Sequence, residues 1–464
     1  MNITLIHLAY LTASLLFVLG LRDLTHPDSA RRGTTMAAVG MLIAVIGTLL
    51  NEEIIRYEWI IGGLILGTII GVPMGLKIPM TKMPERIALS HAFGGLAVAL
   101  VGVVEYIRHA GHLDKLHMTA TGFEVLLGAI TFTGSLMAFG KLQGILPGRP
   151  LTFPGQNLVT VGLMLAGVAM TLGLIFVDSS MTTLFYIMSA IAFLLGILLV
   201  LPIGGADMPV VICLLNSYAG LAASASGFAL NNNVLIICGA LDGGSGFILA
   251  LLMSKAMNRS FTNVIFGAFG SEPVAGQLAT AAPGASVNEA TPEDVAEILQ
   301  HSSSVIVVPG YGMATSQAQH VVREVANLLE KNGAQVRYAI HPVAGRMPGH
   351  MNVLLAEANV PYDQLYDLDQ INDDFANTDV VLVVGANDVV NPAAKTNTKS
   401  PIYGMPVFNC ELARACVCLK RSMNPGFAGI DNELYAAPKT MMLFGDAKQS
   451  LLKVSAALKD GAGH

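Results

Sequence analysis

The chain has 464 residues, of which 53% are hydrophobic and only 12% are charged. Soluble proteins carry about 25% charged residues, so this composition excludes a protein that is soluble along its whole length. The net charge of −6 and the lack of a long basic run argue against a nucleic-acid partner. The apolar excess lies almost wholly before about residue 255, which predicts a membrane part followed by a globular part.

We expect three segments: a transmembrane domain over residues 1–259, a linker rich in Gly, Ala, Ser and Pro over 260–290, and a Rossmann-like α/β domain over 291–464. The first apolar run begins at Ile3 without a preceding basic residue or a following cleavage site, so we interpret it as a retained span. The five cysteines have no zinc-binding spacing; we predict buried thiols, typical of a reducing compartment, and no metal site.

Membrane spans need roughly 20 mostly apolar residues. Basic residues gather after the first, third, fifth and ninth candidate spans, and such residues favour the cytoplasmic side. This bias predicts a polytopic helical bundle with its N-terminus outside and its C-terminal domain inside. The nine candidates are Ile3–Leu21, Thr35–Leu50, Trp59–Leu76, Arg86–Tyr106, Glu124–Leu142, Leu158–Phe176, Met181–Leu201, Val210–Leu230 and Val234–Met253.

Three polar residues inside these spans are candidates for proton transfer, because polar groups are costly in a membrane. His91 lies about 8 Å into the fourth span and Asn216 about 10 Å into the eighth, at 1.5 Å per residue. Both spans begin inside, so the imidazole and the amide lie at similar depth and could form a proton-transfer step. The alternative is that they only hold helices together. Asp242, in the Gly-rich run of the ninth span, lies nearer mid-membrane.

A βαβ unit with a Gly-rich turn opens the globular part. Val305–Val308 predicts a buried strand, Gly310-Tyr-Gly-Met-Ala314 the turn, Gln317–Lys331 a helix and Gln335–Ile340 a second strand. The glycines would let backbone N–H groups approach a pyrophosphate at a helix N-terminus. Thr315 replaces the third glycine of the usual fingerprint, so the context carries more weight than the motif.

The second strand indicates which dinucleotide binds. NAD sites usually end this strand with an acid for the ribose hydroxyls, but here it ends in Ala339-Ile-His-Pro342. This favours NADP(H), whose extra phosphate needs cations. Lys420 and Arg421, after the strand-like Ala415–Leu419, are the candidates to hold that phosphate. The alternative is a solvated pair at a strand end.

A later strand, Val380–Val384, runs into Gly385-Ala-Asn387-Asp388. Ligands of open α/β sheets bind at the carboxyl ends of strands, so Asp388 is expected near the cofactor, unless it only caps a turn. The acidic run over 363–379 is interpreted as a solvated face, with a mobile, pH-sensitive loop as the alternative.

Several long stretches together resemble the β subunit of proton-translocating NAD(P) transhydrogenases, over essentially the whole chain. They are Leu214-Leu-Asn-Ser-Tyr218, Ala256-Met-Asn-Arg-Ser260, Val308-Pro-Gly-Tyr-Gly-Met-Ala314, His341-Pro-Val-Ala-Gly-Arg-Met-Pro-Gly-His-Met-Asn-Val353, Ile371-Asn-Asp-Asp-Phe375, Gly385-Ala-Asn-Asp388 and Lys420-Arg-Ser-Met-Asn424.

The resemblance implies that NADH reduces NADP⁺ while a proton crosses a bacterial inner membrane inward. It implies an α partner carrying the NAD(H) domain, a dimer of αβ units, and proton transfer at His91 and Asn216. Around the NADP(H) site it places Gly310, Tyr311, Gly312, Met313, Ala314, Arg346, Gly385, Asn387, Asp388, Lys420 and Arg421. Phe427 departs from the family, where we associate a Tyr with the loop that covers the nucleotide.

Two other functions compete with this one: an NADP(H)-gated channel without redox chemistry, and a soluble-type NADP reductase with a membrane anchor. Nine spans with buried polar residues are too many for an anchor, and no recognisable selectivity filter supports the channel. Hydride transfer from NADH in the presence of an α partner would separate the three functions.

Overall fold

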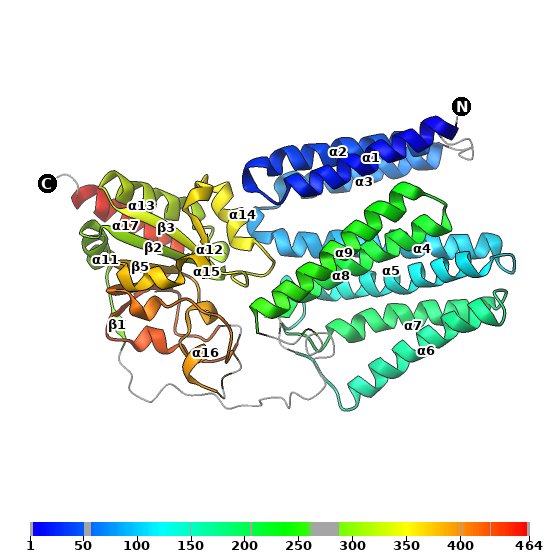
Figure 1. Cartoon of the computed structure of the whole chain (residues 1–464). Helices are drawn as coiled ribbons and strands as arrows, with labels where there is room; N and C mark the ends of the chain where they lie inside the picture. The colour runs from blue at the N-terminus through cyan, green and yellow to red at the C-terminus, as the bar shows by residue number, and fades with distance from the viewer. Residues whose placement is uncertain are drawn as a thin grey trace. The chain divides into compact units, whose positions relative to one another are not determined.

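The structure is a computed structural model, and it describes residues 3–50, 57–148, 150–204, 207–258, 261, 287–398, 400, 402–426 and 428–461. Two parts are described in turn: a bundle of long helices and an α/β domain (Figure 1). Most of the predicted linker lies outside the described residues.

The bundle confirms the predicted spans. Within the described residues, nine helices are long and apolar enough to cross a membrane. They are α1 (Ile3–Asp23), α2 (Pro27–Leu49), α3 (Glu58–Lys77), α4 (Met83–His109), α5 (Lys115–Leu142), α6 (Gln156–Phe176), α7 (Thr182–Val200), α8 (Met208–Ala229) and α9 (Asn233–Ala256).

Two helices, α2 and α5, begin two turns or more before the starts that the hydropathy predicts. α2 begins at Pro27, whose fixed φ suits a first turn, and α5 begins after Asp114, whose carboxylate accepts a hydrogen bond from the His117 N–H at 2.9 Å. An apolar window detects only the part of a helix that lies in hydrocarbon. α5 therefore extends beyond the predicted fifth span, and the Glu124 carboxyl group lies well inside the helix.

Close glycine contacts join α8 to α9. A Cβ atom on Gly220 would lie 2.3 Å from the Gly243 N atom, and one on Gly239 would lie 2.4 Å from the Ser224 N atom. The Ser217 hydroxyl donates to the Gly243 carbonyl at 2.7 Å across the same crossing. Small residues let backbones approach closely in membrane helices, which accounts for the Gly-rich run of α9.

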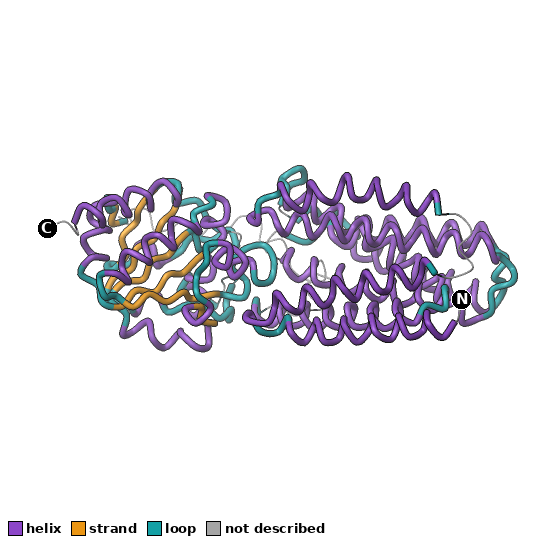
Figure 2. Tube along the Cα trace, turned by 90° about the horizontal axis from the view of Figure 1, so that it is seen from above, coloured by secondary structure: helices purple, strands orange, loops and turns teal. Residues whose placement is uncertain are grey.

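The α/β domain is built on one parallel sheet, drawn in orange in Figure 2. Its strand order is β1-β7-β6-β5-β2-β3-β4. The strands are β1 (Asn288–Glu289), β2 (Ser304–Pro309), β3 (Gln335–Ile340), β4 (Leu365–Asp367), β5 (Val380–Val384), β6 (Ala415–Lys420) and β7 (Thr440–Phe444). The order reverses between β2 and β5, which is where doubly wound sheets bind ligands. The short edge strands β1 and β4 were not predicted, because two or three residues carry no alternating pattern.

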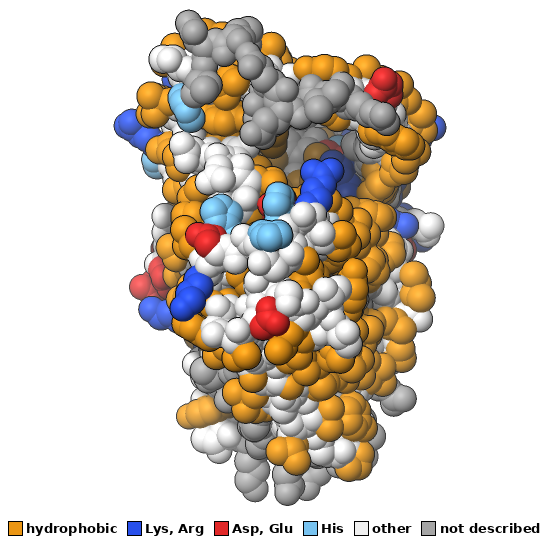
Figure 3. Space-filling model, turned by 90° about the vertical axis from the view of Figure 1, so that its right-hand side faces the viewer, with side chains coloured by type: hydrophobic (Ala, Val, Ile, Leu, Met, Phe, Trp, Pro, Cys, Tyr) orange, Lys and Arg blue, Asp and Glu red, His pale blue; other side chains and the backbone are white. Residues whose placement is uncertain are grey.

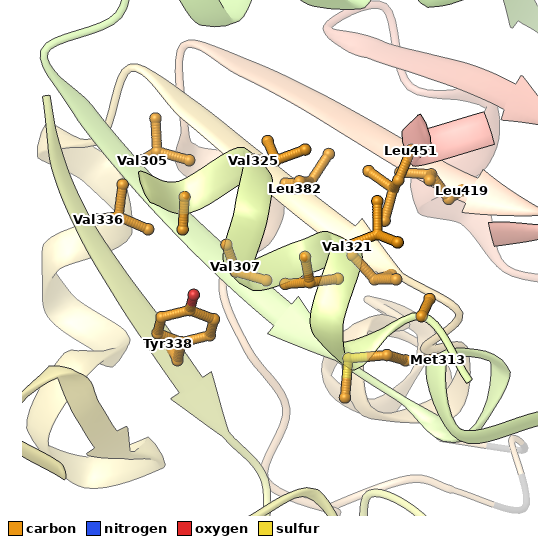
Figure 4. Packing of buried hydrophobic residues seen from close by; sticks show 14 of the residues in the cluster. Val305, Val307, Met313, Val321, Val325, Val336, Tyr338, Leu382, Leu419 and Leu451 are labelled. Carbon is orange, nitrogen blue, oxygen red and sulfur yellow. The ribbon is translucent and has the colours of Figure 1, made fainter. Parts of the chain in front are cut away.

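Alternate residues of the central strands pack on opposite faces of the sheet. One core contains Val305, Val307 and Leu382, together with residues of α13 (Gln319–Lys331) and α17 (Ala447–Gly461) (Figure 4). The other face, with Ile306 and Val308, is covered by short helical turns that include Phe375 and Tyr435. Strands buried on both faces require near-continuous apolar runs, as the sequence indicates.

Candidate functional site

The predicted polar residues of α4 and α8 lie together in the bundle. His91 and Asn216 each follow the first residue of their helix by eight positions, and their side chains interact. The Asn216 amide also donates to the Asp242 carboxylate at 3.2 Å, and His91 interacts electrostatically with that carboxylate. The structure therefore brings all three residues into one cluster. The buried His91 Nδ1 atom has no hydrogen-bond partner within the described part of the chain.

The close glycine contacts between α8 and α9 bring the members of this cluster together. Gly246, one helical turn after Asp242, packs on the Asn216 turn: a Cβ atom there would lie 2.9 Å from the Asn216 amide nitrogen. Asp242 itself is exposed at the surface of the isolated chain. A carboxylate on a lipid-facing surface is costly, so this face of α9 needs a cover of protein or water.

At the switch point of the sheet, the two Gly-rich turns after β2 and β5 contact each other. The Gly312 N–H donates to the Gly385 carbonyl at 2.9 Å, and a Cβ atom on Gly310 would lie 2.3 Å from the Ala386 Cα atom. Gly385 has φ 67°, in the left-handed region. The glycines are thus required by the contact between the turns, besides any approach to a phosphate.

The helix after the first turn differs from the prediction. Most of the predicted turn is itself helical: α12 (Tyr311–Ser316) begins directly after Gly310, with Met313 and Ala314 buried. Gln317 at φ 52° separates α12 from α13. The predicted helix from Gln317 therefore begins two residues late, at Gln319. A left-handed non-glycine residue ends a helix, and the sequence gives little sign of it.

Arg346 lies over the ring of Tyr311, with its guanidinium carbon 4.3 Å from the ring centroid. The His350 Nδ1 atom accepts the Arg346 backbone N–H at 3.1 Å. Burial and the Arg346 cation together lower the pKa of His350 to about 4. His350 thus stays neutral and holds the loop that carries Arg346, at the carboxyl end of β3.

His341 occupies the position where an NAD site usually has its acid. The residue is 2% exposed, and its ring lies between two backbone groups. Nδ1 accepts the Val343 N–H at 3.2 Å, and Nε2 lies 2.8 Å from the Pro406 carbonyl, to which it donates in the matching tautomer. Burial lowers the pKa of His341 to about 4. The end of β3 therefore carries a neutral group. Asp367, beside it on β4, uses its carboxylate to cap α15 (Leu368–Ile371).

Acid should destabilise the α/β domain through His341. Its folded pKa lies below the unfolded value of about 6.5, so the unfolded chain binds the proton more readily, and stability falls as pH drops from about 6.5 towards 4. We expect this residue to contribute a loss of roughly 2–3 kcal/mol over that window. Denaturant unfolding of a fragment from residue 287 at several pH values measures it. His341→Gln, which keeps a donor for Pro406, should flatten the pH dependence; an unchanged slope would contradict the assignment.

Asp388 follows β5, Lys420 is the last residue of the neighbouring strand β6, and the two interact electrostatically. The Asp388 carboxylate accepts the Ala428 N–H at 3.0 Å. The Lys420 ammonium donates to the Asn424 carbonyl at 2.6 Å and lies 4.7 Å from the ring centroid of Tyr435. Burial lowers the pKa of Lys420, while the Asp388 charge opposes this shift. Asp388 therefore also orders the segment after β6.

Arg421 does not join the contacts of Asp388 and Lys420. Its guanidinium pairs with Asp446, at the start of α17, at 3.2 Å, and its side chain is 61% exposed. An exposed pair of this kind contributes little stability, so a phosphate could take the place of the Asp446 carboxylate. The structure thus joins Lys420, but not Arg421, to Asp388.

Sequence reasoning missed two residues that hold the turn after β5. The Tyr435 hydroxyl lies 3.0 Å from both the Ala386 carbonyl and the Asn387 amide oxygen, and the Asn432 amide donates to the Asn387 carbonyl at 3.0 Å. Both lie in or beside a 3₁₀ turn (Glu433–Ala436) without a motif. Phe427 lies outside the described residues.

The acidic run over 363–379 is largely structured. Asp374 pairs with Arg337, Asp379 accepts the Ser303 and Ser304 N–H groups at 2.9 and 3.1 Å, and Asp367 caps α15. Several of these acids therefore stabilise the local structure of the domain through ion pairs and hydrogen bonds.

The fold defines a polytopic membrane protein with a C-terminal Rossmann-like domain. A family model described as NAD(P) transhydrogenase beta subunit matches residues 6–457. The NAD(P) transhydrogenase subunit beta of Rhodospirillum rubrum is 48% identical over 457 residues, covering 97% of this chain and 98% of the relative. A sequence of the same name from a defined strain of that species matches to the same extent. The chain belongs to the NAD(P) transhydrogenase beta subunit family, which confirms the resemblance stated above.

Proposed function

We propose that this chain binds NADP(H) and couples hydride transfer from NADH to NADP⁺ with inward movement of a proton across the membrane. The observation that carries the proposal is the presence, in one polypeptide, of a dinucleotide-type sheet and of the membrane cluster of His91, Asn216 and Asp242. A nucleotide-binding domain and a proton-binding cluster in one chain are explained most simply if hydride transfer at one is coupled to proton movement at the other.

The residues at the carboxyl edge of the sheet fit NADP(H). The end of β3 carries neutral His341 rather than an acid. Among the cations, Arg346 follows β3, Lys420 ends β6 and Arg421 follows it. Arginine and lysine suit phosphate oxygens, and the exposed Arg421 side chain is paired with the half-buried Asp446 carboxylate. When bound, the nicotinamide would supply the hydride chemistry, which needs no protein nucleophile. Tyr435 and Asn432 would orient the turn at Asn387.

The membrane cluster would hold the translocated proton. The imidazole of His91 accepts and releases it, while the Asn216 amide, which does not titrate, orients the ring and bridges to the Asp242 carboxylate. One charge crossing about 200 mV provides roughly 4.6 kcal/mol. At about 1.4 kcal/mol per tenfold change in an equilibrium constant, this energy would shift the ratio of products to substrates of the hydride transfer about a thousandfold. The two nucleotide couples alone provide little driving force, so the proton would provide most of it.

The second nucleotide requires a partner. The described residues form one parallel sheet with one switch point, so we propose that NAD(H) binds to an α subunit, in a dimer of αβ units. The exposed Asp242 marks a face of the bundle that such a partner could cover. We also propose that the bundle lies in a bacterial inner membrane, as the resemblance implies. The basic residues of the loops favour an orientation with the N-terminus outside and the domain from 291 to 464 in the cytoplasm.

The purified chain alone should catalyse no transhydrogenation, because one dinucleotide site cannot hold both substrates. Reconstituted in vesicles with its α partner, it should transfer hydride from NADH to NADP⁺ and move protons with the same time course. The measurement is nucleotide absorbance together with internal pH. Activity of the chain alone would refute the need for a partner, and proton flux that responds to NADP(H) without hydride transfer would favour the gated channel.

A further inference from the structure

A buried carboxyl group in α5 has no place in the function proposed so far. Glu124 is 0% exposed, and neither of its carboxylate oxygens has a hydrogen-bond partner within the part of the chain that the structure describes. The Ser226 hydroxyl of α8 interacts with this carboxyl group. An acid kept in such surroundings is costly, and acids that persist in membrane helices usually serve transport.

Glycines of α4 make room for this side chain. A Cβ atom on Gly102 would lie 3.1 Å from the Glu124 carboxyl carbon, so a larger residue there would collide with the acid. The same face of α5 continues through Gly128, which packs on Ala99, to Thr131, whose Cβ atom would lie 2.9 Å from a Cβ atom on Gly95. The Thr131 and Ser135 hydroxyls have no hydrogen-bond partner among the described residues. α5 thus presents a buried polar stripe to α4.

The stripe has a connection to the surface. Glu124 interacts electrostatically with Glu105 of α4, whose carboxylate lies 2.9 Å from the His109 Nδ1 atom. The Glu105 side chain is 15% exposed and that of His109 is 52% exposed. At the adjoining turn, the His117 ring lies 2.5 Å from the Asp114 carboxylate, and His112 is exposed. Figure 3 shows histidine and acidic side chains gathered on this end of the bundle, among hydrophobic ones.

The two buried ionisable sites lie far apart along α4. Gly102, beside Glu124, follows His91 by eleven residues, or about 16 Å at 1.5 Å per residue. This is about half of a hydrocarbon core of roughly 30 Å, and it is too far for one direct proton transfer. A path with His91 near one face therefore needs a second proton-binding group near the other.

We propose that Glu124 is this second group, a proton-binding site that exchanges protons with the outer face through Glu105 and His109. The inference rests on the proposed proton translocation. The Glu124 carboxylate takes one proton from the Glu105–His109 pair and releases the same proton towards His91, by way of the Thr131 and Ser135 hydroxyls and intervening water. Each transfer regenerates the donor by uptake of a proton from outside, so no other bond changes.

The test uses the full chain with its α partner in vesicles, comparing Glu124→Gln, Glu124→Asp and Glu58→Gln. Gln keeps the size of the side chain but cannot bind a proton, so pumping and steady-state transhydrogenation should fall by about a hundredfold. Asp keeps the carboxyl group, so pumping should persist with a displaced pH profile. Glu58, exposed in the first turn of α3, is the matched control and should behave as wild type. NADP(H) affinity, which reports folding of the cytoplasmic part, should remain unchanged in all three variants.

Two results would overturn the inference. Pumping by Glu124→Gln within twofold of wild type would remove this residue from the path. Equal losses in the Gln and Asp variants with an unchanged pH profile would reduce it to a packing role. Both results leave intact a wild-type complex that pumps, whereas a wild-type complex without coupled activity would instead contradict the proposed function.

Discussion

His91→Ala and Asn216→Ala are each expected to lose proton pumping and hydride transfer together, by about a hundredfold or more. Proton transfer needs a group that titrates near neutral pH, as free imidazole does at about 6.5. Asn216 contributes by its contact with His91 and by the hydrogen bond to Asp242. A tightly coupled enzyme turns over neither half-reaction alone, so both rates should fall equally. The measurement is nucleotide absorbance and internal pH in vesicles that contain the α partner.

The controls separate the cluster from general damage to the bundle. His26→Ala replaces an exposed histidine between α1 and α2 and should leave both rates unchanged. NADP(H) affinity should be the same in all variants. Normal pumping in both His91→Ala and Asn216→Ala would exclude these residues from the path and leave Asp242 as the candidate. Loss of hydride transfer with pumping intact would show that the two parts are not coupled through this cluster.

Hydrophobic periodicity and length predicted the nine spans and the parallel sheet, because both features follow from which side chains avoid water. The similar depth of His91 and Asn216 in their helices was also predictable, since helical rise is constant. The burial of Glu124 was not predictable, because an acid at the end of an apolar run resembles the boundary of a span. Its place inside α5 depends on the glycines of α4, which the pattern of a single helix does not reveal.

In the α/β domain, the Gly-rich turns were predicted from their motifs, but their contact with each other was not. Gly312 and Gly385 are far apart in the chain, and only strand order makes β2 and β5 neighbours. Tyr435 lies 48 residues from Asn387, and no spacing rule connects the two. The pairing of Arg421 with Asp446 was also not predictable. The sequence places Lys420 and Arg421 at one strand end but does not show which acid each of them contacts.

Replacing Lys420 or Arg421 by Ala should weaken NADP(H) binding by about 1.5–3 kcal/mol for each charged hydrogen bond removed, while NAD(H) binding changes little. The extra phosphate is the only group that distinguishes the two nucleotides, so cations that serve it should affect one affinity alone. Titration of the purified full chain with each nucleotide measures both. Lys448→Ala removes an exposed lysine in the first turn of α17; it is the control and should leave both affinities unchanged.

The two cations should respond differently to a second change. Arg421 is paired with Asp446, so its removal leaves an uncompensated carboxylate near the phosphate, and Asp446→Asn should restore part of the affinity that Arg421→Ala removes. Lys420 has Asp388 as its electrostatic partner and lies over Tyr435, so Asp446→Asn should not rescue Lys420→Ala. Equal reductions of NADP(H) and NAD(H) affinity in both single variants would instead show a solvated pair that only supports the strand end, and the extra phosphate would then need another site.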